Sequence, residues 1–216
     1  MPENETLKKT SSKKAGLPLM IITILVLIVV VFMGVVVILG IFREPVPRTP
    51  VEKEILSWKE KVSRNPDDVL NHKNLALAYL SAGQERLAKD EFEIALKLNK
   101  NFYDANLGLA LVFQQEKKFD LAIKELKKVL RKRPEHSEAS FQLGRIYYRQ
   151  KKYTLAQEAF QIVLKTELEN ADAHYYLGLT YQKTKDDSSA AKEFEEALKY
   201  FPGHKAAKDA LTRLQK

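Results

Sequence analysis

The four histidines carry the most versatile chemistry in this chain, because an imidazole can ligate a metal or transfer a proton near neutral pH. They are His72, His136, His174 and His204. None stands four residues from another, and no carboxylate spacing beside them completes a metal-ligand set. His72 and His174 occupy equivalent places of the internal repeat described below, which favours a packing role for both.

Other reaction chemistry also lacks the residues that it needs. The chain has no cysteine, which excludes disulfides, thiol nucleophiles and cysteine-ligated metals. Its glycines form no phosphate-binding loop, and no nucleophile has a base at a known motif spacing. The sequence therefore predicts a protein that is not an enzyme, with no catalytic residue, cofactor, metal or small-molecule substrate.

The strongest cluster of charge is a basic run in the second half of the chain. It consists of Lys124, Lys127, Lys128, Arg131, Lys132 and Arg133. Nucleic-acid binding usually adds interleaved aromatic residues or a known motif, and neither accompanies this run. We therefore expect a solvent-exposed basic face and no nucleic-acid partner. Contact with an acidic protein or a lipid surface is the alternative interpretation.

One pattern of 34 residues occurs four times between Val69 and His204. A leucine is followed by a small residue, and an aromatic residue stands three places after the small one. The leucines are Leu75, Leu109, Leu143 and Leu177, the small residues Ala76, Ala110, Gly144 and Gly178, and the aromatics Tyr79, Phe113, Tyr147 and Tyr181. In the second half of each repeat, the alanines are Ala88, Ala122, Ala156 and Ala190, and the large apolar residues Phe92, Leu126, Phe160 and Phe194.

The spacing inside one repeat predicts two amphipathic helices. Leu143, Gly144 and Tyr147 lie three or four residues apart and so share one helical face. Ala156 and Phe160 begin a second such stripe. Small residues let the two helices approach closely, and the next pair covers the apolar face that one pair leaves open. In length and residue order, the pattern resembles the tetratricopeptide repeat.

This resemblance implies an all-α fold, an α-solenoid of tetratricopeptide helix pairs. The predicted repeats are 69–102, 103–136, 137–170 and 171–204. Before them, Ile55, Trp58 and Val62 are three and four residues apart, so 51–68 is expected to form the leading helix of a degenerate repeat. After them, 205–216 is expected to form a capping helix.

Residues 17–42 are uncharged and rich in isoleucine, valine and leucine. As a helix they would extend about 39 Å at ~1.5 Å per residue, which is enough to cross a bilayer. No small-residue cleavage site follows, so the pattern predicts an uncleaved transmembrane helix in contact with the lipid bilayer. A basic tail over 1–16 precedes it, and a proline-rich linker over 43–50 follows.

The charges around this segment suggest an orientation. The lysines in the tail slightly outnumber the basic residues just behind the segment, which favours a cytoplasmic N-terminus. The prediction is a single-pass protein of the bacterial inner membrane with periplasmic repeats. Repeats exposed to the cytosol on an organelle surface are the alternative.

The resemblance also implies where partners bind, because the first helices of tetratricopeptide repeats line a concave groove. The expected groove residues flank the small residue of each first helix. They are Lys73, Asn74, Leu77, Leu107, Leu111, Gln114, Gln115, Phe141, Arg145, Tyr148, Arg149, Tyr175, Tyr176, Leu179 and Gln182. Aromatic residues and arginine often dominate binding energy. Packing between repeats is the alternative role for Phe141 and Tyr175.

One subgroup of the family binds a partner's terminal carboxylate with a clamp of lysine, asparagine and arginine. Lys73 stands at the lysine place, but Leu77 and Gly108 replace the two asparagines. Glu138 and Gln142 stand where the third repeat should supply lysine and arginine. The clamp is therefore absent, which disfavours binding of a chaperone tail.

Together these features predict a membrane-anchored scaffold for protein–protein interaction, an assembly or accessory factor of a cell-envelope complex that binds proteins or peptides in its groove. The resemblance is to bacterial envelope proteins with an N-terminal anchor and tetratricopeptide repeats. An organelle-surface receptor is one alternative. An envelope enzyme subunit is another alternative, and the lack of recognisable catalytic residues in the sequence counts against it.

Overall fold

The computed structural model describes residues 16–38 and 49–215, and it divides the chain into two compact units, Met1–Arg48 and Thr49–Lys216. Residues 1–15, 39–48 and 216 lie outside the described part. These residues include the predicted basic tail up to residue 15, most of the predicted linker and the end of the predicted segment 17–42.

The first unit contains one described helix, α1 (Gly16–Ile38), whose described side chains are exposed and, except for Thr23, apolar. Across the described residues, no helix is long and apolar enough to span a membrane. This finding contradicts the predicted localisation, a single-pass protein of the bacterial inner membrane with periplasmic repeats.

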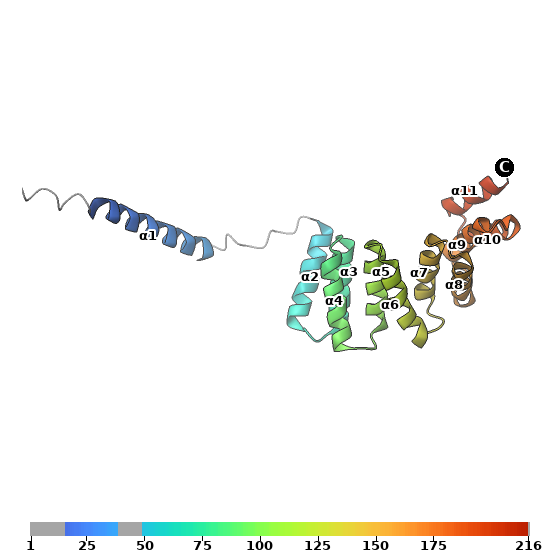
Figure 1. The fold of residues 1–216 in the computed structure, drawn as a ribbon, viewed down its shortest axis with the longest axis horizontal. Coiled ribbons are helices and arrows are strands. Elements are labelled where there is room, and N and C mark those ends of the chain that lie inside the picture. Colours follow the sequence, from blue (N-terminus) through green and yellow to red (C-terminus); the bar gives the residue numbers. More distant parts are fainter. Residues whose placement is uncertain (1–15, 39–48, 216) are drawn as a thin grey trace, which may run out of the picture. The chain divides into compact units, whose positions relative to one another are not determined.

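The described residues of the second unit form helices and connecting turns, with no strand (Figure 1). The helices are α2 (Pro50–Arg64), α3 (Val69–Ser81), α4 (Glu85–Leu98), α5 (Tyr103–Gln115), α6 (Phe119–Lys132), α7 (Ser137–Arg149), α8 (Tyr153–Thr166), α9 (Ala171–Lys183), α10 (Asp187–Tyr200) and α11 (Lys205–Leu214). Each predicted repeat contains one pair, α3–α4, α5–α6, α7–α8 or α9–α10. The all-α solenoid expected from the sequence is confirmed.

Local signals explain where these helices begin. Thr49 and Glu52 form a capping box at the start of α2, so Pro50, assigned to the linker by the sequence pattern, is the first residue of a helix. Asn170 caps α9 by accepting a hydrogen bond from the Ala173 amide. Histidines cap α7 and α11, where His136 and His204 accept the backbone hydrogen bond through Nδ1.

The turn inside each helix pair has one residue in the left-handed region. These residues are Gly83, Lys117, Lys151 and Lys185, with φ of 68°, 58°, 60° and 64°. The amide of Lys151 bonds to the Tyr148 carbonyl, and the next amide, of Lys152, bonds to the Tyr147 carbonyl. Two such bonds satisfy carbonyls at the helix end and reverse the chain.

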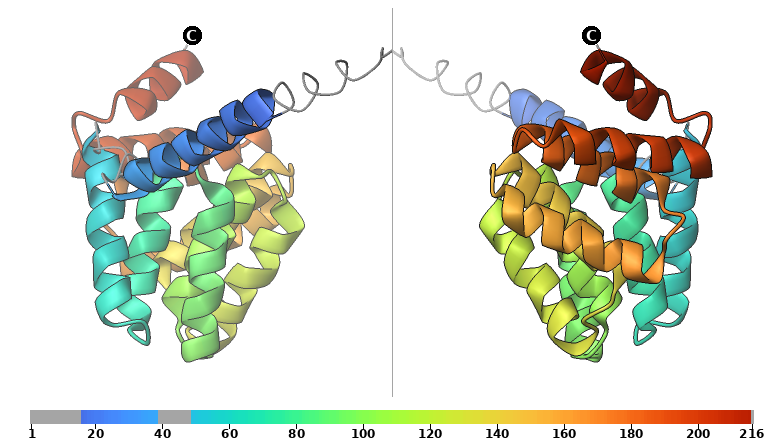
Figure 2. Two further views of the ribbon diagram at one scale, coloured as in Figure 1. Left: turned by 90° about the vertical axis from the view of Figure 1, so that its left-hand side faces the viewer. Right: turned by 90° about the vertical axis from the view of Figure 1, so that its right-hand side faces the viewer.

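The helix pairs form two layers that differ in how closely they pack. Helix α3 contacts α5, and α7 contacts α9, so the first helices touch within the first two repeats and within the last two. Within residues 49–215, the second helices of the repeats (α4, α6, α8 and α10) do not contact one another to the same extent. In a curved array the inner layer is the more crowded one, so the first helices lie on the inner face. Figure 2 shows the helix direction rotating progressively from α2 to α10.

The core between the layers is built from phenylalanine rings placed against glycines. Phe160 and Phe194 are fully buried, and a Cβ placed on Gly144 or Gly178 would come within 2.7 Å of their rings. Their glycines therefore permit the close approach of α7 to α8 and of α9 to α10. At the end of the array, α11 buries Ala207 and Ala210 against the last pair.

Candidate functional site

An aromatic cluster lies where α7, α8 and α9 meet. The Phe141 ring from α7 makes edge contacts with Phe160 at 5.9 Å and with Tyr176 at 5.6 Å, and Tyr176 stacks on Phe160 at 5.7 Å. Tyr148, two turns further along α7, contacts Tyr176 at 6.4 Å and Tyr153 of α8 at 6.0 Å. Phe160 is fully buried, whereas the other four rings are partly accessible. The cluster therefore joins the core to the inner face.

Arg145 lies over this cluster on α7. Its guanidinium carbon is 5.9 Å from the Phe141 ring centre and 5.6 Å from the Tyr176 ring centre. Both distances fall within the range in which a cation is attracted to an aromatic face. No carboxylate of the described residues forms an ion pair with Arg145, and its guanidinium makes a long hydrogen bond of 3.4 Å to the Gln142 side chain. The charge is thus positioned by rings, and no counter-ion for it occurs in the part of the chain that the structure describes.

Gln142 connects the cluster to the preceding repeat. Its side-chain amide donates to Glu138 at 2.7 Å, and its carbonyl oxygen accepts from Gln114 of α5 at 3.3 Å as well as from Arg145. Helices α5 and α7 make no extensive packing contact with each other, so this hydrogen bond is a link between them. Gln142 is 7% exposed, and the sequence pattern did not place it in the site.

Two phenols at the inner face, those of Tyr148 and Tyr175, have raised pKa values. Burial raises the pKa of Tyr148, and the neighbouring Tyr153, Tyr175 and Tyr176 raise it further. Burial also raises the pKa of Tyr175, with Tyr176 adding to the effect and Arg213 opposing it. At neutral pH these side chains therefore offer hydroxyl groups that both donate and accept hydrogen bonds.

The other expected groove residues do not gather at this point. The Lys73 amine lies 3.7 Å from the Asp104 carboxylate, so its charge is partnered. Tyr175 is an exception in part, because its ring contacts Tyr176 of the cluster at 5.4 Å and also contacts Phe194 and the ring of His204, at 6.0 and 4.9 Å. Leu107 packs in the central core, and Leu179 packs beside Tyr175 in the core of the last repeat. Of the remainder, the exposed residues are Leu77, Gln115 and Arg149, and the half-buried ones Asn74, Leu111 and Gln182.

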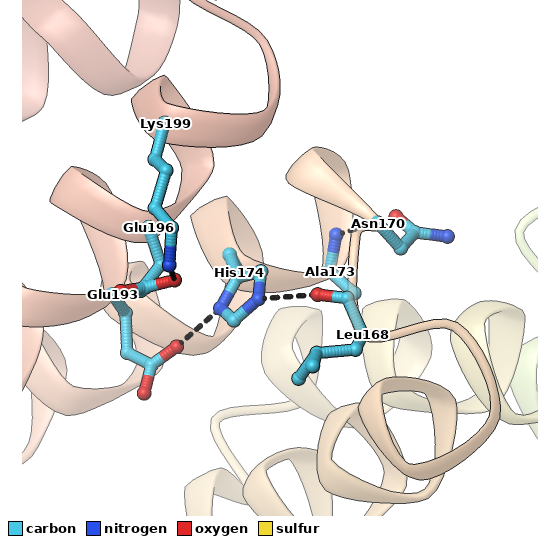
Figure 3. A network of polar contacts seen from close by, with 7 residues as sticks. All are labelled: Leu168, Asn170, Ala173, His174, Glu193, Glu196 and Lys199. Carbon is cyan, nitrogen blue, oxygen red and sulfur yellow. Dashed lines mark hydrogen bonds and ion pairs between the residues drawn. The ribbon is translucent and has the colours of Figure 1, made fainter.

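The two histidines at equivalent repeat positions are buried and fully hydrogen-bonded. His174 Nδ1 lies 2.7 Å from Glu193 on the second helix, and its Nε2 lies 2.9 Å from the Leu168 carbonyl (Figure 3). His72 makes the same pair of contacts with Glu91 and Pro66, at 2.6 and 2.7 Å. Each ring therefore ties the two helices of its repeat together and anchors the preceding loop.

Both partners of the His174 ring are acceptors, so a doubly protonated imidazole satisfies them best. Burial by itself lowers the pKa of His174, but the hydrogen bonds to Glu193 and the Leu168 carbonyl, with the charges of Glu193 and Glu196, outweigh it and the net pKa is raised. The second repeat replaces the histidine by Asn106, which donates to Glu125 at 2.9 Å. These are structural contacts. No group of three histidine, aspartate or glutamate side chains suited to a metal occurs in the described residues.

The family follows from comparison with known proteins. A family model described as tetratricopeptide repeat matches residues 73–126, 111–156 and 142–205, which together cover more than half of the chain. The chain belongs to the tetratricopeptide repeat family. A comparison with curated proteins finds no match.

Solved structures of tetratricopeptide repeat proteins share the fold. PilF of Pseudomonas aeruginosa is 26% identical, over 70% of this chain and 69% of that one, with a TM-score of 0.65. A MamA fragment from Desulfovibrio magneticus RS-1 is 23% identical, over 73% and 89% of the two chains, with a TM-score of 0.63. YrrB is 22% identical, over 75% and 84%, with a TM-score of 0.61. The protein is thus a tetratricopeptide array with a fold made for protein interaction.

Proposed function

We propose that this tetratricopeptide repeat protein is an adaptor that binds a segment of a partner protein on the inner face of its array. The partner segment lies across α7 and α9, and carries an apolar side chain and a carboxylate. The protein acts as an assembly or accessory factor, since the described residues offer a binding surface and nothing that points to catalysis.

The observation that carries this proposal is the setting of Arg145. An arginine held between Phe141 and Tyr176, with no ion-pair partner among the described residues, presents its donors to whatever covers the inner face. Guanidinium groups bind carboxylates in a planar, two-bond geometry. The rings around it supply apolar contact and the Tyr148 hydroxyl supplies a polar one, a combination common at binding hot spots.

The similarity to YrrB supports the proposal. That structure is described as a tetratricopeptide repeat protein with an unusual peptide-binding site. Because its identity to this chain is 22%, the likeness concerns the fold, and the residues that would bind here have to be tested in this chain.

The test is to select peptides that bind the full-length chain from a random phage-displayed library and to measure their affinities by fluorescence anisotropy. Replacing Arg145 and Tyr148 together by alanine should weaken binding by about 30-fold or more, equivalent to ~2 kcal/mol for hot-spot residues. Circular dichroism should change little, because neither side chain belongs to the fully buried core.

Arg86 provides the matched control, since it is an exposed arginine on the second helix α4. Arg86→Ala removes the same charge and should leave the affinity within about twofold. If the selected peptides bind the Arg145→Ala, Tyr148→Ala protein as tightly as the wild type, the inner face at α7 and α9 is not the binding site.

A further inference from the structure

A second surface, on the opposite layer, concentrates most of the chain's net positive charge. Residues 117–133 contain eight lysines and arginines against two carboxylates, a net charge of +6 in a chain whose total is +8. Most of them lie on α6, a second helix, and therefore on the outer face. Charge concentrated in this way attracts oppositely charged molecules from solution.

Few of these charges are neutralised. The buried Glu125 binds Lys128 with both carboxylate oxygens at 2.8 Å and accepts from Asn106 at 2.9 Å. The Arg133 guanidinium lies 5.2 Å from the centre of the Tyr103 ring. Lys118 pairs with Glu116 at 2.9 Å. Among the described residues, no carboxylate pairs with the α6 cations Lys124, Lys127, Arg131 and Lys132, nor with Lys100 beside them. We call these five residues the basic surface.

The basic surface borders two hollows on either side of α6. One, of about 700 Å³, is lined by Leu96, Tyr103 and Asn106, and by Lys100, Lys128, Arg131 and Lys132. The other, of about 680 Å³, is lined by Asp120, Ile123 and Leu130, and by Lys124, Lys127 and Arg131. Arg131 lines both, so a single ligand crossing α6 can reach the two hollows.

We propose that the basic surface is a docking site for an acidic segment of a protein partner, separate from the inner face. Lys124 and Lys132 stand eight residues apart on α6, about 12 Å along the helix axis, so the cations suit a series of carboxylates. A compact anion would reach only part of this length. Ile123 and Leu130 lie among the cations and offer contact to an apolar side chain of the same segment.

The carboxylates of the bound segment meet the amines and the guanidinium, while an apolar residue covers Ile123 and Leu130. The Glu125 carboxylate is occupied by the Lys128 amine and therefore does not neutralise the outer cations. Binding thus needs no rearrangement of the core. Exposed ion pairs are screened by salt over about 8–10 Å, so binding weakens as the salt concentration rises.

The test uses the full-length chain and a fluorescein-labelled peptide probe of sixteen residues. Every fourth residue of the probe is leucine, and the others are glutamate or aspartate. A second probe has the same sequence with glutamine and asparagine for the acids. Lys127→Glu with Arg131→Glu reverses two exposed charges of the basic surface. The control, Lys165→Glu with Lys192→Glu, makes the same change of charge on the exposed surfaces of α8 and α10.

The acidic probe should bind the wild type and the control alike, bind the variant of the basic surface at least tenfold more weakly, and lose affinity with added sodium chloride. The neutral probe should bind at least tenfold more weakly than the acidic one. Arg145→Ala with Tyr148→Ala should leave the acidic probe within about twofold, which separates this site from the inner face.

If the two charge-reversed proteins lose affinity for the acidic probe equally, only the total charge matters, and the proposal is overturned. Loss in the Arg145 and Tyr148 variant alone would also overturn it, because the probe would then occupy the inner face. Sodium polyphosphate and a double-stranded DNA oligonucleotide serve as competing ligands. If either binds the basic surface and the acidic probe does not, the partner is a phosphate polymer and the proposed acidic protein segment is wrong.

Discussion

Replacing the lysines in the left-handed turns by glycine should stabilise the array. Lys117, Lys151 and Lys185 have φ between 58° and 64°, where a side chain with a Cβ is strained. At the equivalent place of the first repeat, Gly83 has a φ of 68°, and a Cβ added there would meet nothing within 4 Å. The strain in these turns therefore comes from the backbone and not from crowding.

The size of the expected stabilisation follows from two opposing effects on the free energy of unfolding. Left-handed backbone costs a residue with a Cβ about 1–2 kcal/mol relative to the right-handed conformation, and glycine avoids that cost. Glycine loses about 0.4–1 kcal/mol more conformational entropy when the chain folds. Lys151→Gly should therefore stabilise by about 0.5–1 kcal/mol. The three substitutions lie in separate turns and should add to roughly 2 kcal/mol.

Urea denaturation followed by circular dichroism measures the effect as a higher midpoint with an unchanged slope. Gly83→Lys is the reverse control and should lower the midpoint by a similar amount. All three lysines are exposed, so the loss of their side chains should contribute little. If Lys151→Gly lowers the midpoint, or Gly83→Lys raises it, the left-handed turns are not the source of strain.

Three further predictions concern the core, the buried histidine and the end of the array. Gly144→Val should destabilise by about 1–3 kcal/mol, because its Cβ would stand 2.7 Å from the Phe160 ring; an unchanged urea midpoint would contradict this close packing. The raised pKa of His174 stabilises the fold. This stabilisation is fully present below the pKa of the unfolded state, near 6.5, and is lost as pH rises through the pKa of the folded state. The melting temperature should therefore fall from pH 6 to pH 8, and fall less in Glu193→Gln; identical pH profiles would refute the linkage. Deleting 205–216 should lower the melting temperature and the solubility by uncovering the last helix pair, and unchanged values would show that α11 is not a cap.

The repeat architecture could be predicted because its signals are local and recur. A leucine, a small residue and an aromatic at helical spacing specify a helical face, and the recurrence at 34 residues specifies stacked pairs. The burial of Phe160 and Phe194 against their glycines follows from the same pattern. The positions of the basic residues on α6 were also evident from the sequence.

The membrane prediction shows the weakness of composition used alone. The sequence of residues 17–42 has the length and apolarity of a spanning helix, but no such helix occurs among the described residues. The pattern also extended the linker to Pro50, whereas the capping box of Thr49 and Glu52 starts a helix there. A side-chain cap depends on two residues in a particular geometry, which average composition does not contain.

The sequence by itself determined that this protein is an all-α array of tetratricopeptide helix pairs, because helical periodicity and a fixed repeat length are readable along the chain. Only the tertiary structure decided which side chains meet. It brought Arg145 to Tyr176 of the next repeat, turned Tyr175 towards His204 and paired Lys73 with Asp104. These contacts depend on the rotation between successive pairs, which is set by how whole helices pack and not by the spacing of residues within one helix.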